Sequence, residues 1–326
     1  MPEFELPAIR PPSESNSLLI RVTRNCPWNR CTFCYGTLYD RQKFELRSID
    51  EIKKDIRELK NFSESLIKWA KNNGFGDRLG DVARANGVSW VNNDGIKTAF
   101  LGDSNSLIVQ TDTLVEILTF LYQTFPDLER VTSYSRAKTV LRKSPDELQK
   151  LKNAGLSRLH IGLETGDNEL LAEIDKGATA DEMVLAGKRI VEAGISLSEY
   201  VVLGLGGKDK WHQHAVETAR VLNSINPNFI RLRTLMVKPN TPLYEKYIKG
   251  EFHLSSCEDI LIEERTLIEH MDVQSQLVSD HISNYLPVDG KLPEEKQRML
   301  ELIDGVLSMD PELRARTVQP EALRSI

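Results

Sequence analysis

The sequence predicts an α/β fold built around a parallel sheet. Six short runs rich in Val, Ile and Leu alternate with longer segments that carry apolar residues at helical spacing. The chain has 326 residues, 40% hydrophobic and 28% charged, which is typical of a folded globular protein. Near-continuous apolar strands joined by helical crossovers indicate a parallel sheet covered by helices. The pattern alone fits either an open doubly wound sheet or a barrel.

The predicted elements follow one another along the first three quarters of the chain. The strands are expected at 17–23, 96–102, 130–136, 158–164, 198–205 and 229–235. The helices between them are expected at 113–125, 144–155, 178–194 and 210–225. Ser144 followed by Pro145 is a good helix start, and Gly155 and Gly194 are good helix ends.

Three regions are expected in the domain organisation. Residues 1–16 form an N-terminal extension, 17–245 the main α/β domain, and 246–326 a helical C-terminal appendage. Within the main domain, 61–94 is too long for one connection and predicts a helical insertion, broken near 74–80. In the appendage, helices are predicted at 256–278 and 293–308.

Charge and hydropathy narrow the possible partners. The net charge of −6 gives no basic excess for binding nucleic acid or acidic lipid. No run of eighteen apolar residues is present, so no membrane span is expected, and the first residues lack a secretion signal. We therefore expect a cytoplasmic protein with a small-molecule substrate.

The cysteines give the sharpest signal. Three of the four, Cys26, Cys31 and Cys34, lie within nine residues directly after the first predicted strand, where α/β barrels place active sites. A disulfide framework is a poor explanation in a large chain without an export signal. A structural zinc site uses four ligands, as does an ordinary electron-transfer cluster. Three cysteines leave one iron of a cubane cluster open for an exogenous ligand.

The sequence around these cysteines resembles that of a known family. The stretch RPPSESNSLLIRVTRNCPWNRCTFCYG resembles a branch of the radical S-adenosylmethionine (SAM) superfamily with four residues between the first two cysteines, where three are commonest. Phe33 takes the usual aromatic position before the third cysteine. The resemblance implies a partial (βα)₆ TIM-like barrel with a helical insertion and a helical C-terminal extension.

The resemblance also implies cofactors and chemistry. The three cysteines would hold a [4Fe–4S] cluster, SAM would bind its open iron, and a flavodoxin or ferredoxin would supply electrons. Reductive cleavage of SAM would give a 5′-deoxyadenosyl radical that abstracts hydrogen from an unidentified small or medium-sized substrate. Arg47 in KFELRS follows the cysteine loop as a conventional family position.

Residues at the strand ends are the candidates for cofactor binding, because the carboxyl ends of parallel strands share one edge of a sheet. Glu164 also predicts a partner, since an unpaired carboxylate in an apolar strand is costly. No strand–GxGxxG–helix fingerprint is present, which excludes nicotinamide binding. The candidates are Phe33, Gly102, Asp103, Ser104, Ser133, Ser135, Arg136, Glu164, Gly204, Gly206, Arg231 and Arg233.

Arg231 and Arg233 share one face of the sixth strand, and the sequence pattern does not decide which way this face points. An interior face would suit an anionic substrate or the SAM carboxylate, and the opposite face would meet helices. Asp280, His281 and Tyr285, in the appendage, are the candidate catalytic residues, and a turn whose polar groups bond the local backbone is the alternative.

Two other functions remain open. A cluster-bearing cofactor chaperone, for example for haem, would use the same fold without catalysis. A zinc-binding structural module is the second alternative. Cys257, which has no cysteine near it in sequence, is expected to be an inert thiol.

Overall fold

The computed structural model describes residues 4–34 and 42–318. The chain divides into two compact units, which we describe separately. The first unit contains residues 1–27, 38–159 and 193–195, and the second contains residues 28–37, 160–192 and 196–326. Strand β6 (Leu156–Glu164) begins in the first unit and ends in the second. The predicted division at residue 245 stays a prediction.

The first unit carries the N-terminal half of the parallel sheet. Its strand order is β1-β4-β5-β6, with β1 at Leu18–Arg21, β4 at Thr98–Gly102 and β5 at Arg130–Ser135. Both β1 and β5 run parallel to β4. A separate antiparallel pair, β2 (Thr23–Arg24) and β3 (Glu45–Leu46), flanks the cysteine loop in sequence. The first three predicted strands are therefore confirmed.

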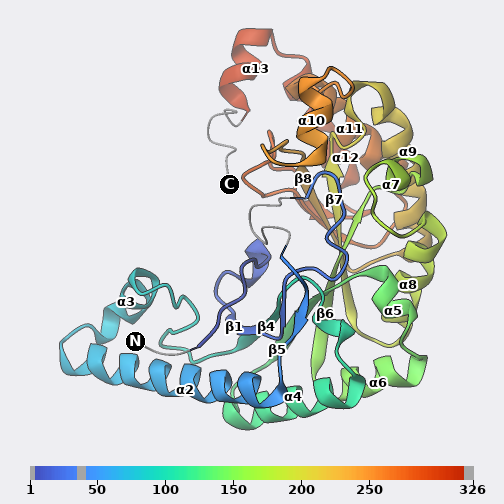
Figure 1. Ribbon diagram of the computed structural model, residues 1–326. Coiled ribbons are helices and arrows are strands. Elements are labelled where there is room, and N and C mark those ends of the chain that lie inside the picture. Colours follow the sequence, from blue (N-terminus) through green and yellow to red (C-terminus); the bar gives the residue numbers. More distant parts are fainter. Residues whose placement is uncertain (1–3, 35–41, 319–326) are drawn as a thin grey trace. The chain divides into compact units, whose positions relative to one another are not determined.

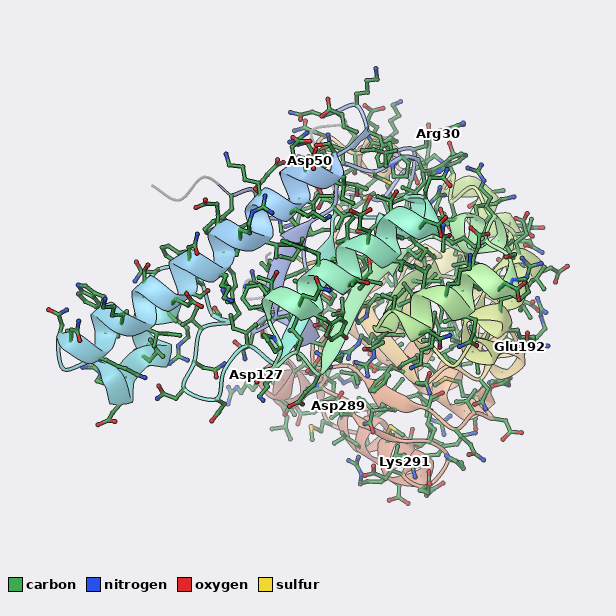
Figure 2. All side chains as sticks on the ribbon, turned by 90° about the horizontal axis from the view of Figure 1, so that it is seen from below. Arg30, Asp50, Asp127, Glu192, Asp289 and Lys291 are labelled. Carbon is green, nitrogen blue, oxygen red and sulfur yellow. The ribbon has the colours of Figure 1, made fainter. Side chains whose placement is uncertain are left out.

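The helical insertion of the first unit begins earlier than predicted. Helix α2 starts at Ile49, because Ser48 and Glu51 form a capping box at its N-terminus. It ends at Asn72, and Gly74, with a φ of +79°, breaks the helix as predicted. Helix α2 lies beside α4 (Figures 1 and 2). The helical segments of this unit are η1 (Pro12–Glu14), α2 (Ile49–Asn72), η2 (Gly76–Arg78), α3 (Leu79–Ala85), η3 (Ser106–Ile108), α4 (Thr111–Thr124), α5 (Ala137–Leu141) and α6 (Pro145–Asn153).

The second unit carries the strand order β6-β7-β8-β9-β10. Strands β7 (Ser196–Leu203) and β8 (Phe229–Thr234) are parallel, as predicted. The prediction of a helix over 256–278 is wrong at its end, because α11 stops at His270 and β9 (Gln276–Val278) pairs in parallel with β8. This pairing buries Leu277 completely. The short β10 (Gly290–Lys291) then adds an antiparallel strand.

The helices of the second unit pack against one another. Helix α9 packs against both α8 and α11, and α11 packs against α12 (Figure 1). The helices of this unit are α7 (Asn168–Glu173), α8 (Ala180–Glu192), α9 (Gly207–Ile225), α10 (Pro242–Ile248), α11 (Cys257–His270), α12 (Lys296–Leu307) and α13 (Pro311–Thr317).

The predicted fold class is confirmed: the protein is α/β, with a mostly parallel sheet that is not closed. The predicted start of α6 is confirmed too, since Ser144 forms a capping box there with Glu147. Charged side chains cover the outside of each unit, for example Asp50 in the first and Glu192 in the second (Figure 2). Across residues 4–34 and 42–318, no helix is long and apolar enough to cross a membrane.

Candidate cluster and cofactor site

The middle of the cysteine loop is anchored within the second unit. The indole Nε1 of Trp28 donates a hydrogen bond to the carbonyl oxygen of Asp175 at 2.6 Å. The same ring lies against Gly177, where an added Cβ would be only 2.4 Å from Trp28 Cζ2. Arg30 pairs with the Asp175 carboxylate at 2.8 Å and stacks on the Trp28 ring. The loop is therefore held by the connection between α7 and α8.

The aromatic residue before the third cysteine is partly buried and packs against a hydrophobic cluster. The backbone nitrogen of Thr32 donates to the carbonyl oxygen of Ile174 at 2.9 Å, and Leu243 donates to that of Thr32 at 3.0 Å. Phe33 itself packs against the side chains of Leu170, Ile174, Val202, Leu205, Leu235 and Leu243. This packing gives Phe33 a role in shaping the loop.

The entrance to the loop is held within the first unit by the end of β4. Asn25, with a φ of +64°, donates from its side chain to the carbonyl oxygen of Lys43 at 2.8 Å. Its backbone nitrogen donates to the carboxylate of Asp103 at 3.3 Å, and its carbonyl accepts from Ser104 Oγ at 3.0 Å. Asp103 is completely buried and pairs with Arg21 at 2.8 Å. Asp103 and Ser104 thus bind the residue before Cys26.

The N-terminal segment completes this region of the first unit. Glu5 pairs with Arg21 and with Arg24, each at 2.6 Å. The hydrogen bond from Arg24 is the main reason that the pKa of Glu5 lies below its ordinary value. Pro7 lies against Gly102, where an added Cβ would be 2.5 Å from Pro7 Cβ. Gly102 is therefore covered by the chain's own N-terminal residues.

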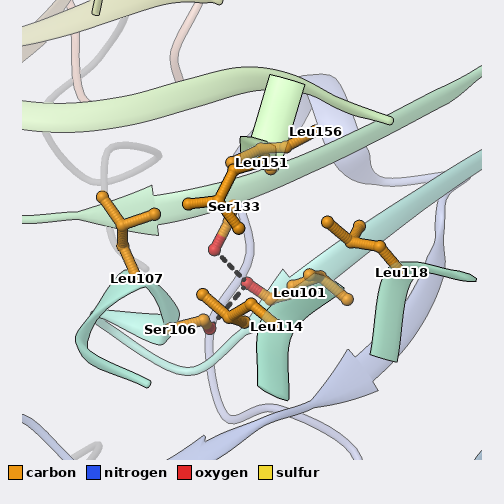
Figure 3. Close-up of a pocket in the computed structure, with 8 residues that line it drawn as sticks. All are labelled: Leu101, Ser106, Leu107, Leu114, Leu118, Ser133, Leu151 and Leu156. Carbon is orange, nitrogen blue, oxygen red and sulfur yellow. Dashed lines mark hydrogen bonds between the residues drawn. The ribbon is translucent and has the colours of Figure 1, made fainter. Parts of the chain in front are cut away.

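The end of β5 is organised by Asn105, which the sequence analysis did not single out. The buried Asn105 Oδ1 accepts from the backbone nitrogen of Arg136 at 3.1 Å and from Ser135 Oγ at 3.4 Å. Ser133 instead lines a small apolar pocket, where its hydroxyl donates to the carbonyl oxygen of Leu101 at 2.8 Å (Figure 3). The available signal for Asn105 was an amide in the polar turn at 103–106, directly after β4.

The end of β6 carries the predicted partner of Glu164. Lys176 pairs with Glu164 at 2.7 Å, and both side chains are nearly buried. Gly162 makes room for this pair, because an added Cβ would lie 1.9 Å from Glu164 Oε1 and 2.9 Å from Lys176 Nζ. Burial raises the pKa of the neighbouring Glu199 on β7 to about 8, an effect that the charge of Lys176 opposes and that of Glu164 reinforces. Neither Lys176 nor Glu199 was predicted as a site residue.

The glycines after β7 are used in close packing. Gly204 has a φ of +77°, and an added Cβ would lie 2.6 Å from Ile260 Cδ1 on α11. Its backbone nitrogen donates to Glu263 Oε1 at 2.8 Å. At Gly206 an added Cβ would lie 3.0 Å from the backbone of Lys210 in α9. Close packing within the chain therefore accounts for glycine at both positions.

The two arginines of β8 share one face of the strand. Arg231 Nε donates to Ser198 Oγ at 3.2 Å, and the guanidinium carbon of Arg233 lies 5.0 Å from the centre of the Tyr200 ring. Burial and the charge of Arg233 lower the pKa of His281 to about 4. The structure therefore brings Arg233 and His281 into one region.

The other two catalytic candidates lie in different environments. Asp280 is exposed, whereas Tyr285 is 9% exposed.

Arg47, in the first unit, is bound to Asp55 at 2.7 Å and to the carbonyl oxygen of Arg21 at 2.8 Å, which identifies a structural role.

The chemistry of the cysteine set fits an iron–sulfur cluster. Cys26 and Cys31 are partly buried and Cys34 is exposed. Within residues 4–34 and 42–318, no three His, Cys, Asp or Glu side chains are arranged to hold a metal ion. The assignment of ligands therefore depends on the motif and on the soft thiolate donors that iron–sulfur clusters use.

Comparisons with curated proteins give partial matches. The haem chaperone HemW of Bacillus subtilis is 23% identical over 175 residues, which cover 53% of this chain and 45% of that protein. The biotin synthase of a Hydrogenobaculum species is 36% identical over 98 residues, which cover 30% of this chain and 28% of that protein. The chain thus spans less than half the length of these two relatives.

Solved structures of similar architecture include methylornithine synthase (PylB), with 17% identity and a TM-score of 0.47 over 79% of this chain and 65% of that chain. The methyltransferase TsrM from Kitasatospora setae, described with cobalamin and a [4Fe–4S] cluster bound, has 16% identity and a TM-score of 0.47. That match covers 69% of this chain and 38% of TsrM.

The family comparison defines the class of protein. The sequence model described as the radical SAM superfamily matches residues 88–219, which include β4 to β7 and most of α9. The chain therefore carries a domain of the radical SAM superfamily, as the resemblance implied. The expected cofactors, a [4Fe–4S] cluster and SAM, are those of this superfamily.

Proposed function

We propose that the chain is a radical SAM enzyme whose [4Fe–4S] cluster is bound by Cys26, Cys31 and Cys34. The observation that carries the proposal is the CxxxxCxxC loop directly after β1 and β2, in a chain that matches the radical SAM superfamily. When bound, the cluster and SAM supply a 5′-deoxyadenosyl radical after one electron enters from a donor such as a flavodoxin or ferredoxin. The substrate is then a small molecule from which hydrogen is taken.

The chain's own residues would prepare this site. Asp103 and Ser104 hold the backbone before the first cysteine, and Trp28 holds the stretch between the first two. The proposed SAM contacts are the backbone at 102–104 and the side chains of Arg136 and Glu164. The hydroxyl of Ser133 is buried and bonded to Leu101, so Ser133 is not among these proposed contacts.

A second candidate function is a cluster-bearing haem chaperone. It is favoured by the similarity to HemW of Bacillus subtilis, which covers 53% of this chain. The two candidates share the cluster and differ in whether SAM is cleaved in turnover with a substrate.

One experiment separates these functions. The protein is reconstituted anaerobically with iron and sulfide and is then given dithionite and SAM. We expect about four iron atoms per chain and formation of 5′-deoxyadenosine. An intact cluster without 5′-deoxyadenosine would favour the chaperone, and a zinc-loaded protein without iron would reject both.

The ligands are tested by single substitutions. Cys31→Ala is expected to abolish cluster binding, since two thiolates cannot replace three. Cys257→Ala is the matched control and should keep the iron content of the wild type, because Cys257 lies at the start of α11, outside the motif. Unchanged iron in Cys31→Ala would exclude Cys31 as a ligand.

A further inference from the structure

Arg233 of the second unit carries a charge that no residue in 4–34 or 42–318 neutralises. Its side chain is half-buried on β8, stacked at 5.0 Å on the Tyr200 ring. Among the residues that the structure describes, none accepts a hydrogen bond from this guanidinium or forms an ion pair with it. A partly desolvated guanidinium presents five N–H donors that need acceptors. The planar donor group is therefore available to an anion.

The loop that carries His281 is bound to β8 on both sides of Arg233. Ser283 Oγ accepts from the backbone nitrogen of Thr234 at 3.1 Å, and Asn284 Nδ2 donates to the carbonyl oxygen of Leu232 at 2.9 Å. Leu232 and Thr234 are the neighbours of Arg233 in sequence. These bonds place the loop, and His281 with it, next to the arginine.

The hydrogen bonds of His281 define what the ring presents. Its Nδ1 accepts from the backbone nitrogen of Ser283 at 3.1 Å, so the proton of the neutral ring lies on Nε2. Burial, and then the charge of Arg233, lower the pKa of His281 to about 4, so the ring is neutral at pH 7. Nε2–H is thus a hydrogen-bond donor beside a fixed positive charge.

We propose that Arg233 and His281 bind an anionic group, a carboxylate or a phosphate, of the substrate. The proposal rests on the proposed function, because it names the class of molecule that the radical would attack. The guanidinium matches two oxygens of such a group, and Nε2–H of the imidazole can donate to an oxygen of the same group.

The neighbouring arginine has a different role. Arg231 is hydrogen-bonded to Ser198 at 3.2 Å, and its charge acts on the carboxylate of Asp289, whose pKa burial raises and Arg231 lowers. Because Arg231 already has these partners, Arg233 is the arginine that an incoming anion would meet. The carboxylate of SAM has the same chemistry as a substrate carboxylate, so the test must separate these two sources.

The test measures binding of inorganic phosphate and of SAM to the anaerobically reconstituted protein by equilibrium dialysis. Arg233→Gln should weaken phosphate binding by about tenfold or more and leave SAM affinity within about twofold of the wild type. Arg233→Lys keeps the charge without the planar donors, so its phosphate affinity should lie between those of the wild type and Arg233→Gln. Arg220→Gln, a change of an exposed arginine on α9, is the control and should bind phosphate as the wild type does. Circular dichroism establishes that each variant is folded.

Two results would overturn the proposal. Equal phosphate affinity in the wild type and in Arg233→Gln would show that the arginine holds no anion. Loss of SAM binding in Arg233→Gln, with SAM displacing phosphate from the wild type, would assign the arginine to the SAM carboxylate.

The dialysis needs no reductant and no turnover, so it is independent of the proposed function. A protein that forms 5′-deoxyadenosine but does not bind phosphate would lose only the anion site. A protein that binds phosphate through Arg233 without cleaving SAM would keep the anion site and lose the radical chemistry.

Discussion

The carboxylate of Asp103 accepts a hydrogen bond from the backbone nitrogen of Asn25, the residue directly before Cys26, at 3.3 Å. Sequence reasoning placed Asp103 among the SAM-binding residues, and that role stays a prediction. The observed bond adds a role in positioning the cysteine loop, since the same buried carboxylate also pairs with Arg21 at 2.8 Å.

Replacement of Asp103 by Asn is expected to weaken both the fold and the cluster. The substitution leaves Arg21 without its buried partner, which costs about 3 kcal/mol of unfolding free energy. Urea denaturation measures this loss, and iron content after reconstitution should fall below that of the wild type. Asp127→Asn, an exposed change in the same unit, is the control. Wild-type iron content in Asp103→Asn would remove the positioning role.

Gly162→Ala tests the space reserved for the Glu164–Lys176 pair. The new Cβ would lie 1.9 Å from Glu164 Oε1, so the ion pair must move. Overpacking of this kind lowers the unfolding free energy by about 1–3 kcal/mol. At Gly305, within α12, no atom lies within 4 Å of an added Cβ. Gly305→Ala should therefore stabilise the protein by about 0.5–1 kcal/mol, through helix propensity. Equal stability of Gly162→Ala and wild type would contradict the tight fit.

Glu199→Gln should stabilise the protein at neutral pH. Burial raises the pKa of Glu199 from 4.5 to about 8, so the folded protein holds a proton that the unfolded chain releases above pH 4.5. The wild type therefore loses stability as pH rises from 4.5 to about 8. Glutamine imitates the neutral acid and removes this loss, a gain on the order of 3 kcal/mol at pH 7.

Thermal or urea unfolding of Glu199→Gln and wild type between pH 4.5 and 8 measures the effect. The difference in stability between the two proteins should grow with pH. A constant difference over this range would show that Glu199 does not titrate with a raised pKa.

Glu5→Gln should have the opposite pH dependence. The hydrogen bond from Arg24 lowers the pKa of Glu5 below 4.5, so its stabilising effect is present above that pH and is lost as pH falls through the lowered value. The variant should lose about 1 kcal/mol at pH 7, because these ion pairs are only partly buried. The loss should shrink in acid. An equal loss at pH 7 and pH 3 would contradict the role of the Glu5 charge.

The sequence predicted the elements whose signal is local. Apolar runs identified the strands, and the Ser144 cap identified the start of α6. Strand β9 was missed because it has only three residues and pairs with β8, whose partner residues lie 47 positions earlier. Helical periodicity over 256–278 obscured this pairing. Lys176 was missed for a related reason: its partner, Glu164, lies on a different element, and no motif links them.

The candidate site was predictable where a motif carries the chemistry. The spacing of the three cysteines predicts them as cluster ligands, the family resemblance predicts a role for Phe33, and both stay predictions. The roles of Asp103, Ser104 and Ser133 depend on the direction in which each side chain points. In the structure they form hydrogen bonds with Asn25 and Leu101, and a polar residue at a strand end does not by itself specify these partners.

The ring of Pro7 fills the space that a side chain at position 102 would need, since a Cβ there would lie 2.5 Å from the proline ring. The two positions are therefore expected to vary together among related sequences. Where position 102 carries a side chain, the segment around position 7 should be displaced or replaced by a smaller residue. The first residues of the chain and the turn after β4 have to evolve as a pair.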